Sequence, residues 1–371
     1  MEIKSYSEIY FEPLIDFLRK SWAENHSIYE KQLFDWQYGG CMGDSSACLL
    51  LLDNNNEIQG FLGTVSYPFM VNDSVSNAAA LSIWVVDKNI RSSGAGKNLK
   101  KTVEDRFHTV YAIGMNPATI RYYENHGYSY HNSLHRYVLP LDTECFKLFL
   151  IDSDRTDEGK VMGWFDSIRF SEPTAPSTDF NSDILAEIYQ RNVAPHFLVR
   201  PKKDAAFWEW RYIKSKGFKY LFHETEDNVV IFRIENTYSP GDLLKHDRKC
   251  LRIIEILPND GNVWNGKPNK DLAETLQTVL TWAKEQGCIL ADFQISNSGL
   301  GHVLEEVGFR IQSEDNVTNL TRLFSPLRPD AAPLNFAYRI KNHAGEILNV
   351  DREDTYILKS DSDMDRPNYL G

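Results

Sequence analysis

LSIWVVDKNIRSSGAGK, from Leu81 to Lys97, is the stretch that decides the fold. Its first six residues predict a strand, which leads into a turn that contains Gly94 and Gly96. Because glycine has no Cβ, the backbone can turn sharply there and a ligand can come close. The residues that follow predict a helix, whose first N–H groups lack internal partners and whose dipole favours an anion. With Arg91 and Lys97 beside it, this turn predicts a phosphate-binding site.

A second strand and a short helix come directly after this unit. The strand is predicted over residues 109–115 (TVYAIGM), and the helix lies in NPATIRYYENHGY, from Asn116 to Tyr128. The motif R-x-x-G-x-G after a strand, followed by N-x-x-x-x-x-x-Y-x-x-x-G-Y, resembles the GNAT (GCN5-related) N-acyltransferase superfamily. Either half of the pattern alone is weak, but the two in this order and spacing are fairly specific.

The resemblance implies a role for each residue of the motif. In that family the turn amides hold the pyrophosphate of an acyl-coenzyme A (acyl-CoA), the Asn helps to hold the pantetheine arm, and the Tyr protonates the departing thiolate. Carried over by position, Asn116 has the second role, and Tyr123 is the predicted catalytic acid. Amides near Val85 and Val86 are expected to stabilise the tetrahedral intermediate. The predicted pyrophosphate-binding turn comprises Arg91, Ser92, Ser93, Gly94, Ala95, Gly96 and Lys97.

The general base is not assigned by the sequence. An amine acceptor must lose a proton before it attacks the thioester, and the strand before the turn has no carboxylate until Asp87. Asp87 is expected to lie closer to the phosphate than to the reacting carbon. A water chain, or a residue of the second half such as His196 or His302, stays open.

The second half of the chain repeats the pattern of the first. NSGLGHVLEEVGF, which starts at Asn297, aligns with NPATIRYYENHGY, which starts at Asn116, so the offset is 297 − 116 = 181 residues. We therefore predict two copies of one fold in tandem. The second copy lacks R-x-x-G-x-G, and Leu304 stands at the position of Tyr123 and cannot donate a proton. It is expected to shape the acceptor pocket or to complete the core.

Recurring aromatic residues indicate packing. Trp36 and Tyr38 of LFDWQY return as Trp210 and Tyr212 of FWEWRY, in the copy that has lost its catalytic groups. A core role is therefore favoured for all four. Arg211 is the exception, since a fixed guanidinium there is a candidate clamp for a phosphate of a nucleotide-linked acceptor.

The predicted fold is mixed α+β, with two tandem GNAT-like domains whose mostly antiparallel central sheets are flanked by helices; the second copy is degenerate. The predicted ranges are 1–150 for the catalytic domain with the acyl-CoA site, 151–182 for a linker, 183–325 for the degenerate domain and 326–371 for a C-terminal extension. The strands that close the first sheet are expected between Tyr128 and Leu139.

The C-terminal extension ends in SDSDMDRPNYLG. A calcium loop of the D-x-D-x-D type would need a Gly and a closing Glu that are missing here, so a solvated terminus is favoured and no metal is predicted. The D-R-P-N ending resembles that of GNAT-like proteins from surface-polysaccharide gene clusters.

Composition fits two folded domains and excludes other classes. The 371 residues carry a net charge of −12, which argues against a nucleic-acid binder. An anionic cofactor must therefore be held by local amides and a few cations. The longest apolar run, Cys48 to Leu52, is too short to span a bilayer. With no signal peptide and no C-x-x-C pair, a reduced cytoplasmic setting is predicted from the scattered cysteines, which are Cys41, Cys48, Cys145, Cys250 and Cys288.

We expect acyl transfer from acetyl-CoA or another acyl-CoA directly to a small-molecule amine. The resemblance and the aromatic content, with eight Trp and eighteen Tyr, favour an amino sugar on a nucleotide carrier, in polysaccharide biosynthesis. The alternatives are a protein or peptide N-acyltransferase and a non-catalytic acyl-CoA-binding protein. A pocket with arginines would favour the sugar nucleotide, and an acidic groove would favour a basic peptide. The sequence leaves the acyl length and the oligomeric state open.

Overall fold

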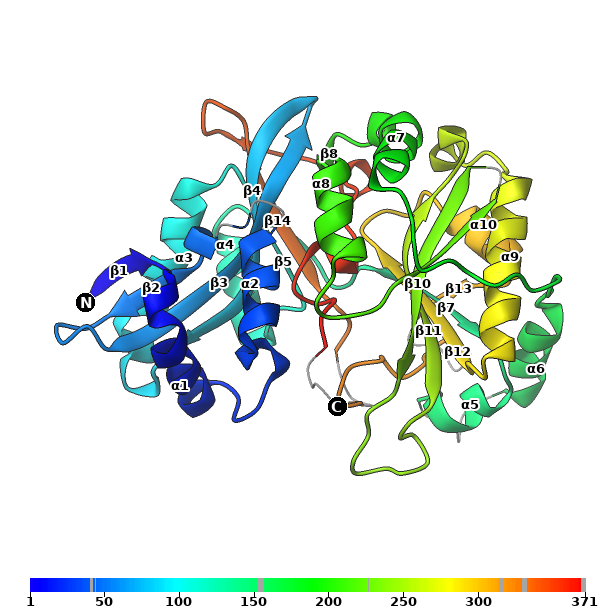
Figure 1. Ribbon diagram of the computed structural model, residues 1–371, viewed down its shortest axis with the longest axis horizontal. Coiled ribbons are helices and arrows are strands. Elements are labelled where there is room, and N and C mark those ends of the chain that lie inside the picture. Colours follow the sequence, from blue (N-terminus) through cyan, green and yellow to red (C-terminus); the bar gives the residue numbers. More distant parts are fainter. Residues whose placement is uncertain are drawn as a thin grey trace.

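The computed structural model describes residues 1–40, 43, 45–151, 157–225, 227–313, 317–328 and 332–367. Figure 1 shows two sheets side by side, each with helices around it, and the C-terminal segment (red) between them. The architecture is the mixed α+β fold that the sequence predicts, with two similar halves.

The first sheet has nine strands in the order β1–β2–β3–β4–β5–β14–β15, with β6 beside β14 and β8 beside β3. All of its described pairs are antiparallel except β4 with β5. Its strands are β1 (Glu2–Ser5), β2 (Leu49–Leu52), β3 (Ile58–Val71), β4 (Ser74–Val86), β5 (Thr109–Ile113), β6 (Ser129–His131), β8 (Val199–Pro201), β14 (Phe336–Lys341) and β15 (Ile347–Leu348).

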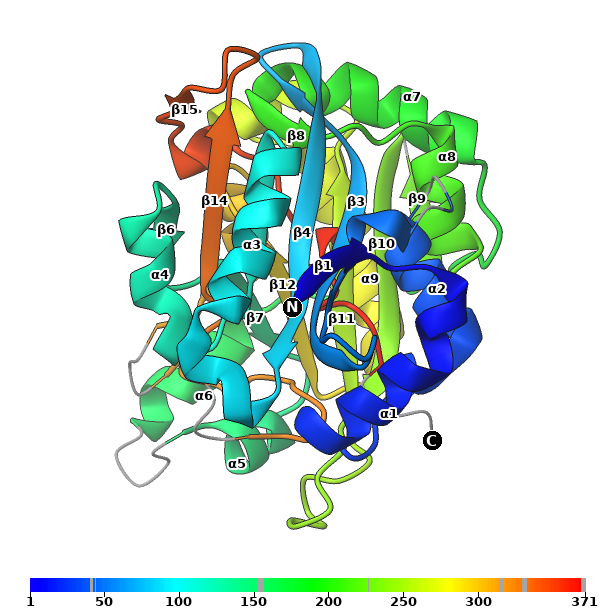
Figure 2. The same ribbon diagram turned by 90° about the vertical axis from the view of Figure 1, so that its left-hand side faces the viewer.

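Helices cover both faces of the first sheet. The helices α1 (Phe11–Ser21) and α2 (Lys31–Gly39) belong to one core cluster, and α3 (Ala95–Arg106) and α4 (Ile120–Asn125) belong to another. Figure 2 shows α3 running along β4, which it contacts. Leu99 and Val103 of α3 are fully buried and form its apolar stripe.

The second sheet has six strands in the order β13–β7–β12–β11–β10–β9. Its strands are β7 (His135–Pro140), β9 (Leu221–Thr225), β10 (Asn228–Asn236), β11 (Lys249–Leu257), β12 (Leu290–Ile295) and β13 (Arg310–Ile311). The helices of this half are α5 (Glu144–Phe149), α6 (Glu158–Ser167), α7 (Ser182–Asn192), α8 (Ala205–Trp208), α9 (Lys270–Glu285) and α10 (Gly301–Glu306). The buried stripe of α9 packs against β9 and β10.

The two sheets exchange a strand, which the sequence analysis did not predict. β6 stays with the first sheet, but β7 pairs with β12 and β13 of the second sheet. In return β14, from the C-terminal part of the chain, fills the place between β5 and β6. The expectation that all strands between Tyr128 and Leu139 close the first sheet is therefore wrong for β7, because alternation predicts a strand and not its partner. The sheets accordingly do not follow the boundaries at residues 150 and 326.

A pair of tryptophans joins the two halves. The indole Nε1 of Trp36 donates to the carbonyl of Trp210 over 2.8 Å, and the indole of Trp210 donates to the carbonyl of Trp36 over the same distance. The two ring centroids are 5.9 Å apart. This reciprocal contact relates the repeated motifs and confirms the packing role predicted for both residues.

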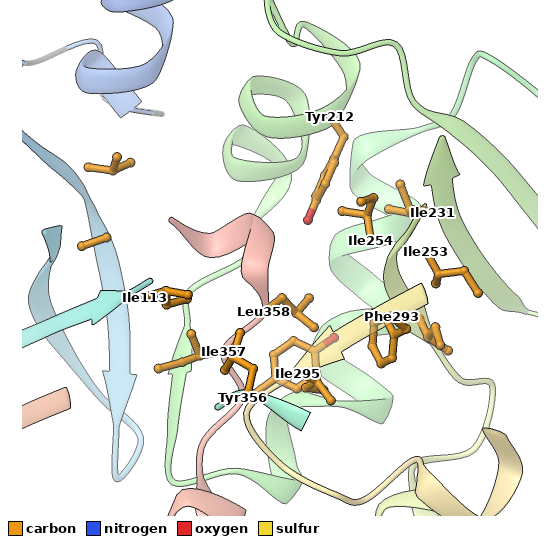
Figure 3. Packing of buried hydrophobic residues seen from close by; sticks show 14 of the residues in the cluster. Ile113, Tyr212, Ile231, Ile253, Ile254, Phe293, Ile295, Tyr356, Ile357 and Leu358 are labelled. Atoms are coloured by element: carbon orange, nitrogen blue, oxygen red, sulfur yellow. The ribbon is translucent and has the colours of Figure 1, made fainter. Parts of the chain in front are cut away.

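The last described segment, residues 355–367, is called the tail below and lies between the sheets. Figure 3 shows Tyr356, Ile357 and Leu358 of the tail packed between Ile113 of the first sheet and Ile295 of the second. Ser296 donates its backbone N–H to the carbonyl of Ile357 over 2.8 Å, which fixes the tail to the end of β12.

The acidic residues of the tail are buried in ion pairs. The Asp361 carboxylate lies 3.0 Å from Lys203 Nζ, and the Asp365 carboxylate lies 2.7 Å from Arg233 Nη1. The prediction of a solvated terminus is therefore wrong for the tail, because distant cations neutralise these carboxylates. The phosphate-clamp hypothesis for Arg211 is also wrong, since Arg211 is buried and donates to the carbonyls of Ser360 and Asp365 over 2.7 and 3.0 Å.

Across the described residues, no cluster of His, Cys, Asp or Glu side chains is suited to hold a metal ion. In the same part of the chain no helix is long and apolar enough to cross a membrane. The cysteines Cys48, Cys145, Cys250 and Cys288 are free and buried, and Cys41 lies outside the described residues.

Candidate active site

A cleft opens in the first half where β4 and β5 separate. The two strands pair in parallel from Ala78 with Thr109 to Leu81 with Ala112, and β4 then continues to Val86 beside β3. Beyond Leu81, the backbone groups of β4 that face away from β3 have no strand partner in the described structure, and all but the Val86 carbonyl, which accepts from Arg91 Nε, are open to a ligand. A cavity of about 760 Å³ lies in this splay. We refer to it as the acyl-CoA cleft.

Eight of the eleven predicted site residues line the acyl-CoA cleft, and their roles in binding stay predictions. The residues brought together there are Val85, Val86, Arg91, Gly94, Gly96, Lys97, Asn116 and Tyr123. Ser92, Ser93 and Ala95 belong to the same turn but do not line the cavity. The Ser93 hydroxyl instead donates to the Ile90 carbonyl over 2.7 Å, which stabilises the turn itself.

The turn needs its two glycines for different reasons. Gly94 is the N-cap of α3 and has a φ of +79°, a conformation that strains residues with a Cβ. Gly96 lies against Trp84, where an added Cβ would come within 3.3 Å of the indole Nε1. The Asp87 carboxylate caps the preceding 3-10 helix by accepting from the Asn89 N–H over 2.9 Å. Asp87 therefore supports the turn rather than the reacting carbon.

Asn116 and Tyr123 lie on the opposite wall, after β5. The side-chain oxygen Oδ1 of Asn116 accepts from the Ala118 N–H over 2.9 Å. The side-chain NH₂ of Asn116 is therefore left for a ligand. The Tyr123 ring is only 3% exposed, and its hydroxyl has no hydrogen-bond partner in the described part of the chain. Burial, with the nearby charge of Glu104, raises the pKa of Tyr123, so the phenol stays protonated at neutral pH. The neighbouring Tyr122 instead has its hydroxyl 3.4 Å from Glu104.

Lys100 lies behind Tyr123 in an aromatic cage. Its Nζ is 3.1 Å from the centroid of the Tyr123 ring and is buried with no hydrogen-bond partner in the described structure. Burial lowers the pKa of Lys100 to about 6, partly opposed by Glu104. The cage is completed by the rings of Trp84, Tyr122 and Tyr128.

The tail brings a carboxylate to the cleft that the sequence analysis missed. Asp363 lines the acyl-CoA cleft, and one of its oxygens accepts from Ser82 on β4 and from Arg366. Its other oxygen has no partner among the described residues. Ser82 is held in turn by Tyr38, whose hydroxyl lies 3.1 Å from the Ser82 hydroxyl. The D-x-D-x-D run, which contains Asp363, and the D-R-P-N ending are the sequence signals that marked this segment.

The two histidines left open as bases lie elsewhere. His302 is bonded to the Lys267 carbonyl at 2.9 Å, and His196 packs beside Gly261. Neither lines the acyl-CoA cleft. Among the described residues that line it, Asp363 is the one carboxylate and there is no histidine.

Comparisons with known proteins agree with the class that this fold and cleft define, a GNAT-type fold with an acyl-CoA site. Residues 11–128 match the family model described as Acetyltransferase (GNAT) family. No curated protein sequence matches the chain. This match covers 118 of the 371 residues, all of them in the first half.

Three solved structures show the same overall fold. Saccharomyces cerevisiae N-myristoyltransferase with bound myristoyl-CoA and inhibitors has a TM-score of 0.56 and 12% identity, over 96% of this chain and 85% of that chain. A GCN5-related N-acetyltransferase from Anabaena variabilis has a TM-score of 0.51 and 14% identity, over 92% and 73%. A probable N-acyltransferase from Enterococcus faecalis has a TM-score of 0.53 and 9% identity, over 91% and 72%. Together with the GNAT match, this fold supports an acyl-CoA-dependent N-acyltransferase.

Proposed function

We propose that the protein transfers an acyl group from acyl-CoA to the amine of a small molecule, with both substrates bound at once. The observation that carries this proposal is that the phosphate turn, the Tyr123 phenol and the Asp363 carboxylate line one cleft. Acyl-CoA fits that cleft with its pyrophosphate at the N-terminus of α3 and its pantetheine arm beside Asn116.

In the proposed mechanism Asp363 is the general base. Its free oxygen accepts a proton from the acceptor ammonium, and the neutral nitrogen then attacks the thioester carbonyl to form the new C–N bond. The free amides of β4 near Val85 and Val86 stabilise the oxyanion of the tetrahedral intermediate. The C–S bond breaks as that intermediate collapses, and Tyr123 donates its proton to the thiolate. The second amine proton leaves to solvent, Asp363 releases its proton to solvent, and the Tyr123 phenolate regains one, so each turnover releases one proton.

For the acceptor we favour an amino sugar, on a nucleotide carrier, in surface-polysaccharide biosynthesis in the cytoplasm. The support is the D-R-P-N resemblance and a cluster of arginines near the tail. Transfer to a protein or peptide amine is the alternative within the same chemistry.

The test is thiol release from acetyl-CoA with a panel of amines, comparing the wild type with Tyr123→Phe. We expect Tyr123→Phe to lower kcat by about 10²-fold or more while the Kd for CoA is unchanged, since only proton transfer is removed. Tyr122→Phe is the matched control, because the Tyr122 hydroxyl faces Glu104 and not the cleft. Binding of CoA without turnover for any amine would instead support the acyl-CoA-binding protein.

A further inference from the structure

A second cavity, of about 230 Å³, lies against the tail at Lys359, four residues before Asp363. Four cationic side chains line it, and none of the described residues that line it is a carboxylate. The cations are Arg136, Arg252, Arg322 and Lys359. In a chain with a net charge of −12, four clustered cations are not explained by the overall composition, so the cluster indicates a local role for positive charge.

The sheet itself fixes two of these cations. The strands β7 and β11 flank β12. Arg136 on β7 and Arg252 on β11 both form an ion pair with Asp292 of β12. The Asp292 oxygens lie 2.9 Å from Arg136 Nε and 3.1 Å from Arg252 Nε. Asp292 therefore pairs with both guanidiniums, Glu235 lies 3.9 Å from Arg252 Nε, and no carboxylate among the described residues lines the cavity itself.

Two of the donors at the cavity have no partner in the described structure. Lys359 Nζ makes no hydrogen bond or ion pair there, and one Nη of Arg252 is free while the other donates to the Leu323 carbonyl over 3.1 Å. Burial lowers the pKa of Lys359 to about 7, with Arg252 and Arg233 adding to that effect and Asp365 and Glu235 opposing it. A bound anion would satisfy these donors and favour the charged lysine.

A third cavity, of about 550 Å³, adjoins both the cationic cavity and the acyl-CoA cleft at the tail. It shares Lys359 with the cationic cavity, and it shares Asp363, Met364 and Arg366 with the acyl-CoA cleft. A ligand whose anionic end lies at Lys359 can thus extend along the tail to Asp363.

We propose that the cationic cavity binds an oxyanion of the acceptor, a phosphate or a carboxylate, and so holds the acceptor amine at Asp363. The inference rests on the proposed acyl transfer, but the oxyanion site can be tested without turnover. It narrows the acceptor to anionic amines.

The first experiment measures binding of inorganic phosphate and of malonate to the full chain by calorimetry. Lys359→Gln should weaken binding by about tenfold, as expected for the loss of one charge-assisted contact. Lys214→Gln removes an equal charge from an exposed lysine of the same half and should change nothing. The anion that binds more tightly identifies the group. Equal affinities in wild type and Lys359→Gln would overturn the proposal.

The second experiment compares acceptors that share one amine: glucosamine, glucosamine 6-phosphate and 2-amino-2-deoxyglucuronic acid. An anionic acceptor should have the lower KM, and Lys359→Gln should raise that KM about tenfold and leave glucosamine unaffected. Equal KM values for neutral and anionic amines would overturn the inference and leave acyl transfer standing. Phosphate binding without turnover for any amine would overturn the proposed function and leave the oxyanion site.

Discussion

The two halves of the molecule share a design and differ in what fills it. β4 and β5 pair in parallel over four residues and then splay, and β11 and β12 do the same over three. Each splay is followed by an Asp-capped 3-10 helix and a left-handed glycine, Gly94 at φ +79° and Gly266 at φ +78°. In the first half the splay holds an open cleft. In the second half the chain itself fills it.

The filling shows what each position is suited to bind. The Asn297 amide, which corresponds to Asn116, donates to the Thr355 carbonyl over 2.9 Å. The Tyr356 ring packs edge-on against Trp264 at 5.6 Å and donates to Glu255 over 2.9 Å. The tail thus occupies in the second half the place that we propose for the pantetheine arm in the first. One segment closes one groove and delivers Asp363 to the other.

The largest expected effect is on catalysis in the first half, and it tests the role of Asp363. Asp363→Asn keeps the size of the side chain and its contact with Ser82 but cannot accept a proton, so kcat should fall by about 10²–10⁴-fold. The measurement is steady-state thiol release, with an unchanged Kd for CoA as control, at a temperature well below the Tm of the variant, which loses the ion pair with Arg366. A loss of less than about threefold would exclude Asp363 as the base.

The next effect is on stability, and it tests how the tail is held in the second half. Lys203 Nζ lies 2.8 Å from Glu255 and 3.0 Å from Asp361, all fully buried, and joins the tail to β11. Lys203→Met leaves both carboxylates without their cation and should lower the free energy of unfolding by about 3–5 kcal/mol. Denaturant unfolding measures it. Lys202→Met, at an exposed neighbour, should stay within about 0.5 kcal/mol of the wild type.

A matched glycine pair sharpens the comparison. Gly94→Val and Gly266→Val place the same β-branched residue at nearly the same φ, and neither added Cβ meets another atom within 4 Å. Both should cost about 1–2 kcal/mol of backbone strain. Only Gly94→Val should also weaken CoA binding, by about tenfold, because the turn must move to release the strain. Equal Kd values for CoA in the two variants would contradict the assignment of the phosphate turn.

The last effect is a pH dependence of stability to which Lys100 of the first half contributes. The pKa of Lys100 is about 6 in the folded chain against an ordinary 10.5, so between these values the unfolded state binds one more proton than the folded state. Stability should therefore rise with pH, by up to ~1.4 kcal/mol per pH unit from this group. Lys100→Met should remove that slope between about pH 7 and pH 9 in denaturant titrations. Parallel slopes in the two proteins would show that Lys100 stays charged.

Local sequence patterns predicted most of the fold and the candidate site of the first half. The turn, Asn116 and Tyr123 lie within one strand–helix unit, so their spacing predicts their meeting in one cleft, and the repeat predicted the second half. What escaped prediction is non-local. Asp365 pairs with Arg233, which lies 132 residues away in the sequence. A run of alternating Asp residues has the same sequence pattern whether water or distant cations surround the carboxylates. The exchange of β7 for β14 escaped for the same reason, because a strand's pattern does not name its neighbour.

That exchange also bears on how the chain is made. β14 lies inside the first sheet, yet it begins at Phe336 of 371 residues. During synthesis this edge of β5 stays unpaired until residues 336–341 have left the ribosome, long after β1 to β5 have emerged. A protein truncated before Phe336 would therefore expose an unpaired strand edge that can pair with other chains and aggregate. The nascent chain that ends before β14 is accordingly the stage of synthesis most in need of a chaperone.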